Sequence, residues 1–367
     1  MRASLGWAVV LLCSASAACG SSAGGDGGGT GSPDGGGMTA SDASSSPEAT
    51  SPTDGGPGGN TMDAPQGKGD SGGHPSGDAA PPPSGDGGSG YGNDGPVPYT
   101  MTSLPVTSSL DSFTVNVWIP SPSGPHPVVS FSPGLVQPSA GYVVYAQRLA
   151  SWGFVVLMRD DPGLLVSGDT VASDISYTVA TWLAAQNTTS SSPLFGKADL
   201  SHVGLAGHSR GGQSTLDAAE EGLLGKVGAW VGLDPVNTAY VSGTAPSTNL
   251  PSIGIPTLYL GAGVATNCAP AGDNYQTLYA VSPSPSIAIT VANASHSQFE
   301  NVGGSVGGLI CSPLGTANTQ TVIELAMKYL TAFFALELLG DSSVGVQFQG
   351  EGIAADEAAG LVTLVSK

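Results

Sequence analysis

Apolar and amphipathic stretches alternate along the chain from residue 98 onward. Several of the apolar stretches are continuous runs of Val, Ile and Leu, which is typical of strands covered on both faces of a sheet. They predict strands at 113–119, 128–131, 154–158, 202–206, 227–233, 256–261 and 286–292. The amphipathic stretches predict helices at 142–151, 174–186, 209–221, 274–281 and 319–339. This alternation predicts an α/β fold, with a mostly parallel sheet and helices on both faces.

Two local features refine this pattern. Asp174 lies near the capping position of the second predicted helix, with Ser173 just before it. Residues 234–254, between two predicted strands, are rich in Pro, Ser, Thr, Gly and Asn and lack helical periodicity. We therefore expect no helical lid in this segment, and an open cleft.

The first 95 residues differ in composition from the rest. Residues 20–95 hold 25 of the 56 glycines, 10 of the 28 acidic residues and no Val, Ile, Leu, Phe or Trp. A segment with so little apolar surface to bury cannot offset its ordering entropy, so we expect a disordered tether. The predicted organisation is a signal segment at 1–19, the tether at 20–95, a folded domain at 96–340 and an extension at 341–367 of unknown role.

The N-terminus has the pattern of an export signal. A positive charge precedes an apolar segment at 5–12 that is too short to span a membrane. The small residues that end in Cys19 resemble a bacterial lipoprotein processing box, although Ser16 stands where that box usually has Leu. We expect lipid on Cys19 to anchor the protein in the bacterial cell envelope, at the outer membrane or cell surface. Ordinary signal cleavage with secretion is the alternative.

The four cysteines divide by position. Cys13 leaves with the signal and Cys19 is the predicted lipid site, so Cys268 and Cys311 remain as an even pair in an oxidising compartment. We predict a disulfide between them, worth about 4 kcal/mol on the chain-entropy model; two buried free thiols are the alternative. No His or second Cys lies at ligand spacing to either, so we expect no metal site and no cofactor.

The charge excludes one class of partner. The chain has a formal net charge of −19 and only 9 Lys and Arg residues, which argues against nucleic-acid binding by a basic patch. The predicted tether carries −9 of this charge, and residues 96–367 carry −11, from 18 acidic and 7 basic residues.

One motif carries the chemistry. Residues 202–206 predict a strand that runs into Gly207-His208-Ser209-Arg210-Gly211-Gly212 and then into an amphipathic helix. This is a G-x-S-x-G motif between a strand and a helix. Gly207 and Gly211 permit a sharp turn and remove side chains where two backbones crowd, which presents the Ser209 hydroxyl at the carboxyl edge of the sheet. We identify Ser209 as a candidate nucleophile.

A nucleophilic serine needs a base, and the chain has five histidines. Four of them lie in the tether, before a strand, at the start of a strand or at the variable position of the turn: His74, His126, His202 and His208. His296 lies just after the last predicted strand, which is where the order Ser, Asp, His places the base in such a sheet. We assign His296 as the candidate base.

The third member of a triad orients the imidazole and stabilises its cation. Asp234 follows directly after a predicted strand, whereas Asp273 lies a dozen residues past the next one. The loop that holds Asp273 is the more usual location, but the backbone at Asp234 is better defined. The pattern of residues leaves the two as alternatives.

Acyl transfer also needs donors for the developing oxyanion. The backbone N–H of Arg210, the residue after the nucleophile, is one candidate. The second should come from the loop after strand 128–131, where Gly134 lets the backbone approach a substrate and Leu135 offers its N–H.

The residues at 98–340 resemble the α/β-hydrolase superfamily. Within it, GHSRGG at 207–212, GLDPV at 232–236, CAP at 268–270 and the segment 142–158 are similar to the chlorophyllase family. Bacterial cutinase-like polyester hydrolases are the next relatives and share the SPG loop and a G-H-S-x-G-G turn. They usually have Met where Arg210 stands, and an aromatic-bearing loop where GLDPV stands.

This resemblance implies an α/β-hydrolase fold with Ser209 as nucleophile, His296 as base and, through GLDPV, Asp234 as acid. The expected function is hydrolysis of lipophilic or polymeric carboxylic esters through an acyl-enzyme, with no cofactor. An acyltransferase that uses the same serine, and a non-catalytic surface binding module on a hydrolase scaffold, are the alternatives.

Overall fold

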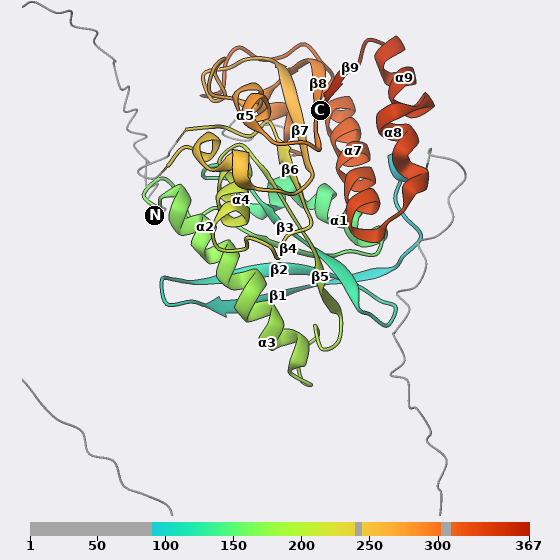
Figure 1. The fold of residues 1–367 in the computed structure, drawn as a ribbon. Helices are drawn as coiled ribbons and strands as arrows, with labels where there is room; N and C mark the ends of the chain where they lie inside the picture. The colour runs from blue at the N-terminus through green and yellow to red at the C-terminus, as the bar shows by residue number, and fades with distance from the viewer. Residues whose placement is uncertain (1–89, 239–243, 302–309) are drawn as a thin grey trace, which may run out of the picture. The chain divides into compact units, whose positions relative to one another are not determined.

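The computed structural model describes residues 90–238, 244–301 and 310–367 (Figure 1). The predicted signal segment with Cys19, and the predicted tether up to residue 89, lie outside the described residues. In η1 (Gly90–Gly92), Tyr91 is 5% exposed and its ring stacks on Trp152 with centroids 4.2 Å apart. Residues 90–95 therefore belong to the folded domain, which starts earlier than the predicted residue 96.

Nine strands of the described chain form one sheet in the order β1-β2-β4-β3-β5-β6-β7-β8-β9. The neighbouring pairs from β4 to β8 are parallel, whereas β2 is antiparallel to β1 and β4, and β9 is antiparallel to β8. The strands are β1 (Tyr99–Thr107), β2 (Ser112–Pro120), β3 (His126–Ser132), β4 (Val155–Arg159), β5 (Ala198–His208), β6 (Ala229–Leu233), β7 (Thr257–Val264), β8 (Ser286–Ser295) and β9 (Val362–Ser366). The mostly parallel sheet and its helices are those of the predicted α/β-hydrolase fold.

Helices cover both faces of the sheet (Figure 1). One face packs against α1 and α7, and the other against α2, α3, α4 and α5. The α-helices are α1 (Val143–Ser151), α2 (Gly168–Tyr177), α3 (Leu183–Thr188), α4 (Arg210–Glu220), α5 (Tyr275–Val281), α7 (Thr319–Leu339), α8 (Val346–Gln349) and α9 (Glu351–Ala358), and a π-helical turn, η3 (Thr178–Trp182), joins α2 to α3. In the part of the chain that the structure describes, no helix combines the length and apolar character needed to cross a bilayer.

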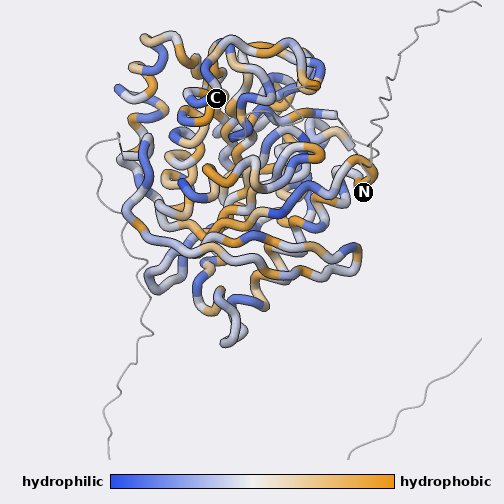
Figure 2. Tube along the Cα trace, turned by 180° about the vertical axis from the view of Figure 1, so that it is seen from behind, coloured by the Kyte–Doolittle hydropathy of each residue, from blue (hydrophilic) through white to orange (hydrophobic). Residues whose placement is uncertain are grey.

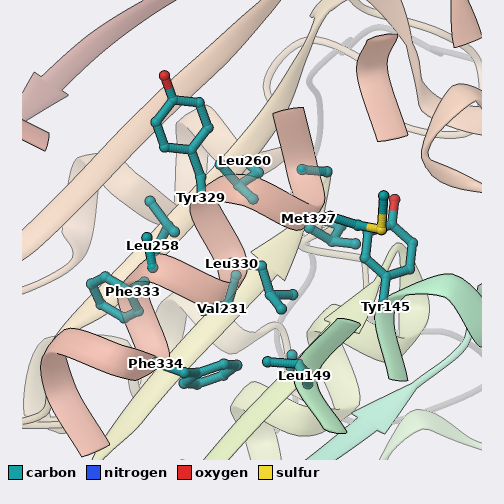
Figure 3. Packing of buried hydrophobic residues seen from close by; sticks show 14 of the residues in the cluster. Tyr145, Leu149, Val231, Leu258, Leu260, Met327, Tyr329, Leu330, Phe333 and Phe334 are labelled. Atoms are coloured by element: carbon teal, nitrogen blue, oxygen red, sulfur yellow. The ribbon is translucent and has the colours of Figure 1, made fainter. Parts of the chain in front are cut away.

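The continuous apolar runs of the central strands follow from burial on both sides. In β4, Val155 and Leu157 belong to the apolar cluster on one face, and Val156 and Met158 to the cluster on the other. Figure 3 shows the second face, where strand residues of β6 and β7 meet large side chains of α7 and α1. In Figure 2 hydrophobic stretches run along strands in the middle of the domain.

The C-terminal residues form part of the sheet. β9 pairs with Ile287–Val291 of β8, and Lys367, which follows β9, exchanges two backbone hydrogen bonds with Ser286. On α9, Asp356 accepts a hydrogen bond from Lys328 of α7 at 2.8 Å. Residues 341–367, expected to be an extension of unknown role, thus complete one edge of the sheet.

The helix predicted at 174–186 begins earlier than expected. α2 starts at Gly168, and the hydroxyl of Ser167 caps it by accepting the N–H of Thr170 at 3.1 Å. Asp174, expected near a cap, lies inside the helix at 1% exposure and pairs with Arg159 at 2.8 Å. Its acidic side chain serves a buried ion pair, which a local capping pattern does not reveal.

The segment between β6 and β7 contains two short 3-10 turns in its described part, η4 (Pro246–Thr248) and η5 (Leu250–Ser252). Residues 239–243, within the stretch expected to lack a helical lid, lie outside the described residues. The predicted disulfide between Cys268 and Cys311 is present and joins the loop after β7 to the segment before α7.

The turn between β5 and α4 is crowded by backbone atoms. A Cβ on Gly211 would lie 2.0 Å from the carbonyl oxygen of Ser132 and 2.3 Å from that of Pro133, at the end of β3. A Cβ on Gly207 would lie 2.4 Å from the backbone of Gly211. Glycine at these positions lets the first turn of α4 sit directly against the ends of two strands.

α4 also buries two carboxyl groups. Asp217 and Glu220 are 9% and 8% exposed, and Asp217 lines a cavity of about 370 Å³ between α2 and α4. Burial, and then the nearby Asp169 and Glu221, raise the pKa of Asp217 to about 8. Burial, and then Asp217 and Glu221, raise the pKa of Glu220 to about 9. Folding therefore favours the protonated form of both groups.

We expect Gly211→Ala to lower the free energy of unfolding by at least about 2 kcal/mol, because the added methyl group meets backbone oxygens that cannot move independently. Gly345→Ala is the matched control, since a Cβ there meets no atom within 4 Å and the backbone φ is −52°. It should shift stability by less than about 0.5 kcal/mol. Denaturant unfolding measures both, and equal midpoints for the two variants would contradict the crowding.

Folding stability should fall as pH rises from about 4 to about 9. The unfolded chain releases the Asp217 and Glu220 protons near pH 4, whereas the folded protein keeps them to pH values of about 8 and 9. Asp217→Asn keeps a neutral side chain at every pH, so it should lose less stability than the wild type between pH 5 and 9. Urea unfolding at both pH values tests this, with Glu351→Gln, a change at an exposed carboxyl, as control. If the free energy of unfolding of Asp217→Asn fell with pH as steeply as that of the wild type, burial of the Asp217 carboxyl would not be the cause of the pH dependence.

Candidate active site

Ser209 occupies the sharp turn between β5 and α4. Its backbone has φ 55° and ψ −124°, a left-handed region that residues with a side chain rarely adopt. Its N–H donates to the carbonyl of Leu233, the last residue of β6, at 3.1 Å. The strained turn thus places Ser209 at the carboxyl edge of the sheet, beside the end of the neighbouring strand, as the motif predicts.

Asp234 follows β6 and points at the loop after β8. Its Oδ1 accepts the N–H of Ala262 at 2.9 Å, and its Oδ2 lies 2.7 Å from Nδ1 of His296. The side chains of Asp234 and His296 are 2% and 4% exposed. A carboxylate bound in this way holds the imidazole in one orientation and stabilises its protonated form.

His296 begins the 3-10 turn η6 (His296–Phe299), directly after β8. The turn is held by a capping box, in which Gln298 accepts the N–H of Ser295 at 2.8 Å, and Gln298 in turn donates to the carbonyl of Ala317 at 2.6 Å. When Nδ1 donates to Asp234, the neutral ring carries its lone pair on Nε2. That nitrogen is the one available as a base.

The alternative acid, Asp273, has a different partner. Its carboxylate accepts the hydroxyl of Thr238, and its carbonyl accepts the N–H of Asn237 at 3.1 Å. Asp273 thus ties the loop after β6 to the loop after β7. Of the two candidate acids, Asp234 is the one that contacts His296.

A buried histidine that the sequence set aside connects the loops around Ser209. The hydroxyl of Tyr142 lies 2.7 Å from Nδ1 of His208, and Nε2 of His208 lies 3.0 Å from the carbonyl oxygen of His296. The hydroxyl of Tyr142 also accepts the N–H of Gly134 at 3.2 Å. Burial, and then the charge of His296, hold the pKa of His208 well below its usual value.

A neutral His208 fits this chain of hydrogen bonds. Tyr142 donates to Nδ1, and Nε2–H donates to the carbonyl of His296. The chain links the loop after β3, through Gly134, to the loop that carries His296. The only sequence signal for this role is the position of His208 in the GHS turn, which points its ring away from the nucleophile.

The loop expected to supply an oxyanion donor lies next to Ser209. A Cβ on Gly134 would lie 3.5 Å from Cβ of Ser209, an ordinary van der Waals distance, and 3.1 Å from Nδ1 of His208, so the backbone at Gly134 lies close to both residues. Leu135 follows it directly and is half-buried. The two predicted donor residues, Leu135 and Arg210, are thereby brought to the same end of the sheet as Ser209.

The side chain of Arg210 has a role that the sequence did not predict. It is completely buried and pairs with Asp161, past the end of β4. It also donates to the carbonyls of Val166 at 2.7 Å and Gly163 at 3.3 Å. The guanidinium therefore holds the loop at 161–166 against the first turn of α4.

The described ranges contain no group of three or more His, Cys, Asp or Glu side chains arranged to hold a metal ion. What these residues do assemble is a serine in a strained turn, whose neighbour His208 lies 3.0 Å from the backbone carbonyl of a buried, carboxylate-bound histidine. This arrangement can activate a hydroxyl as a nucleophile.

The sequence of this chain is similar to that of known proteins. The family model for chlorophyllase matches residues 97–311. The chain is 31% identical over 179 residues to chlorophyllase-1, chloroplastic, of Citrus unshiu, a match that covers 44% of this chain and 51% of the relative. It is 26% identical over 286 residues to chlorophyllase-1 of Arabidopsis thaliana, covering 68% of this chain and 86% of the relative. The chain spans about half the length of the citrus protein that it matches. By the extent of the family match, together with its sheet and its Ser209 turn, the chain belongs to the chlorophyllase family of the α/β-hydrolase superfamily.

Proposed function

We propose that this protein is a serine hydrolase of carboxylic esters that works through an acyl-enzyme. The observation that carries the proposal is the buried contact of 2.7 Å between His296 Nδ1 and Asp234 Oδ2, beside the turn that holds Ser209. With Nδ1 bound to a carboxylate, Nε2 is the basic nitrogen of the ring. Membership of the chlorophyllase family supports the same reaction class.

In the proposed reaction, Ser209 Oγ attacks the ester carbonyl carbon while His296 Nε2 takes the hydroxyl proton. The tetrahedral intermediate then collapses, the bond to the alcohol oxygen breaks, and His296 gives its proton to that oxygen. In the second half, His296 takes a proton from water, whose oxygen attacks the acyl carbon. The bond from that carbon to Ser209 Oγ then breaks, and His296 returns the proton to Oγ, which leaves the acid and the free serine hydroxyl. Asp234 stabilises the imidazolium in both halves.

The oxyanion of each tetrahedral intermediate would accept hydrogen bonds from the backbone N–H groups of Arg210 and Leu135. Donors fixed before the reaction need no reorganisation as the negative charge develops, and one such donor is worth about 3–4 kcal/mol of transition-state stabilisation. The close approach of Gly134 to Ser209 supports this assignment.

We propose lipophilic or polymeric esters as the substrate class. Three exposed apolar side chains on the loops beside Ser209 support this class: Val136, Leu164 and Leu165 are 50%, 64% and 94% exposed. Val136 follows the proposed donor Leu135, and the two leucines lie between the carbonyls of Gly163 and Val166 that bind Arg210. Apolar side chains around a polar reaction centre favour substrates with apolar portions.

We also propose that lipid on Cys19 anchors the exported protein in a bacterial cell envelope. The pattern of residues 1–19 supports this proposal, and the polar, acidic stretch that follows would act as a tether for the domain.

The full-length protein should hydrolyse nitrophenyl esters of increasing chain length, and Ser209→Ala should lower kcat by about 10³-fold or more because it removes the nucleophile. Release of nitrophenol measures the rate. Ester product in the presence of added alcohols would show transfer to an acceptor in place of water. Equal inactivity of wild type and Ser209→Ala on every ester would refute the enzymatic function and favour a binding module.

Asp234→Asn should lower kcat by about 10³- to 10⁴-fold, since an amide cannot stabilise the imidazolium and can favour the wrong tautomer. Asp273→Asn is the matched control, because Asp273 binds Thr238 and not His296, and it should change kcat by less than about threefold. Steady-state kinetics on one ester distinguish the two. The reverse ranking of the two variants would overturn the assignment of the acid.

A further inference from the structure

Asp161 is a buried carboxylate that the proposed reaction steps do not use. Its side chain is 1% exposed, and four donors from three parts of the chain converge on it. Arg210 donates from Nε at 3.0 Å and from Nη2. The N–H of Val136 donates to Oδ1 at 2.8 Å, and the N–H of Gly163 donates to the same oxygen at 2.9 Å.

These contacts reach both sides of the proposed oxyanion site. Arg210 supplies one proposed donor through its own backbone N–H, and its side chain ends on Asp161. Val136 directly follows Leu135, the second proposed donor, and its N–H ends on the same carboxylate. The backbone N–H of Asp161 also donates to the carbonyl of Gln137 at 3.0 Å, which ties the two loops together a second time.

The loop at 134–137 needs such support. The N–H of Gln137 donates to the carbonyl of Gly134 at 3.0 Å, and Val136 has φ 64°. A turn with positive φ at its third residue is a type II turn, in which Gly or Asn is favoured and a β-branched residue is strained. Relaxation of Val136 to negative φ would rotate the peptide between Leu135 and Val136, which directly follows the peptide that carries the Leu135 N–H. The bond from its N–H to Asp161 opposes that rotation.

We propose that Asp161 is a positioning residue for catalysis: through Arg210 and Val136 it holds the two backbone donors of the oxyanion site in their reactive orientation. This inference rests on the proposed ester hydrolysis. Asp161 touches neither the proton in transfer nor the ester, so its effect is on the transition state, through the geometry of the donors. Because the carboxylate and guanidinium are shielded from water, the coupling between the two loops is not weakened by solvent.

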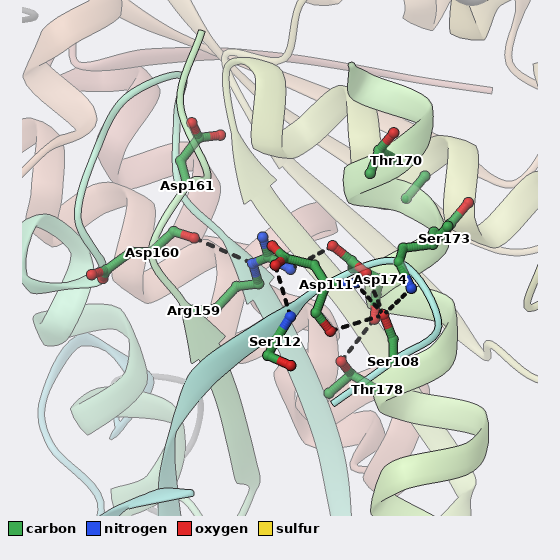
Figure 4. Close-up of polar contacts among 12 residues, drawn as sticks. Ser108, Asp111, Ser112, Arg159, Asp160, Asp161, Thr170, Ser173, Asp174 and Thr178 are labelled. Carbon is green, nitrogen blue, oxygen red and sulfur yellow. Dashed lines mark hydrogen bonds and ion pairs between the residues drawn. The ribbon is translucent and has the colours of Figure 1, made fainter. Parts of the chain in front are cut away.

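The molecule offers a matched control for a lost buried ion pair. Arg159 and Asp174 pair at 2.8 Å with side chains 8% and 1% exposed, on the strand and helix that flank the same loop. Asp174 also accepts the hydroxyl of Ser108 at 3.3 Å. In Figure 4 the carboxyl group of Asp161 points away from this cluster, and the carboxylate of Asp174 binds Arg159 and Ser108, which both lie outside the loop at 134–137. Removing the charge of Asp174 should cost stability without moving the oxyanion donors.

The test compares Asp161→Asn with Asp174→Asn in the full-length protein, by kcat and KM on a nitrophenyl ester, by thermal unfolding and by affinity for an alkyl boronic acid. The boronate forms a tetrahedral adduct on Ser209 that mimics the oxyanion.

We expect both variants to unfold at lower temperature. At temperatures where both are folded, Asp161→Asn should lose about 10- to 100-fold in kcat, with KM within about threefold, and lose boronate affinity by a similar factor. Asp174→Asn should keep kcat and boronate affinity within about twofold.

The following outcomes decide the inference. Asp161→Asn with unchanged kcat, or the same kcat loss in both variants, would overturn it in favour of a purely structural ion pair. If Asp161→Asn does not fold, Asp161→Glu replaces it in the test. Its carboxylate still pairs with Arg210, but the longer side chain displaces the carboxylate oxygen that binds the N–H of Val136. An unchanged kcat in Asp161→Glu would equally overturn the inference. A wild type no more active than Ser209→Ala would instead refute the proposed ester hydrolysis, and this inference with it.

Discussion

The structure around Ser209 depends on the close approach of backbones at the turn between β5 and α4. Gly211 lies against the carbonyls that end β3, and Gly207 lies against the first turn of α4, so no side chain separates the helix from the strands. This contact sets the strained φ of Ser209 and brings the N–H of Arg210, the loop after β3 and the end of β6 to one place. The cost of the strain is met by the packing of the large parallel sheet beneath it.

Around this turn, buried polar groups are joined across loops that are distant in the chain. Asp234 joins the end of β6 to the loop after β8 through His296. His208 and Tyr142 join the loop after β8 to Gly134. Asp161 joins Val136, in the loop that contains Gly134, to Arg210. Each contact satisfies a polar atom that burial would otherwise make costly, and each fixes one loop relative to another. The arrangement of the candidate site is therefore a property of the network, which the sheet supports.

The central strands were predictable because each is covered on both faces and therefore has a continuous apolar run. The outer strands were missed for the same physical reason. β1 is largely exposed along its length, and the short β9 has a single buried residue, Val362, so neither carries the apolar run that marks a central strand. The start of α2 was placed too late because Asp174 looks like a cap in sequence, whereas its partner, Arg159, lies on a neighbouring strand.

The sequence by itself determined the order of the central strands and of the helices between them, the turn that holds Ser209 with its glycines, the candidate base His296 by elimination among the histidines, and the family resemblance. These follow from local patterns, because chain periodicity and turn geometry depend on neighbouring residues. Only the tertiary structure decided which carboxylate meets His296, and it alone brought Asp161 to Arg210 and His208 to Tyr142. Those pairings join residues far apart in the chain, and the direction of a side chain at the end of a strand is set by the sheet around it.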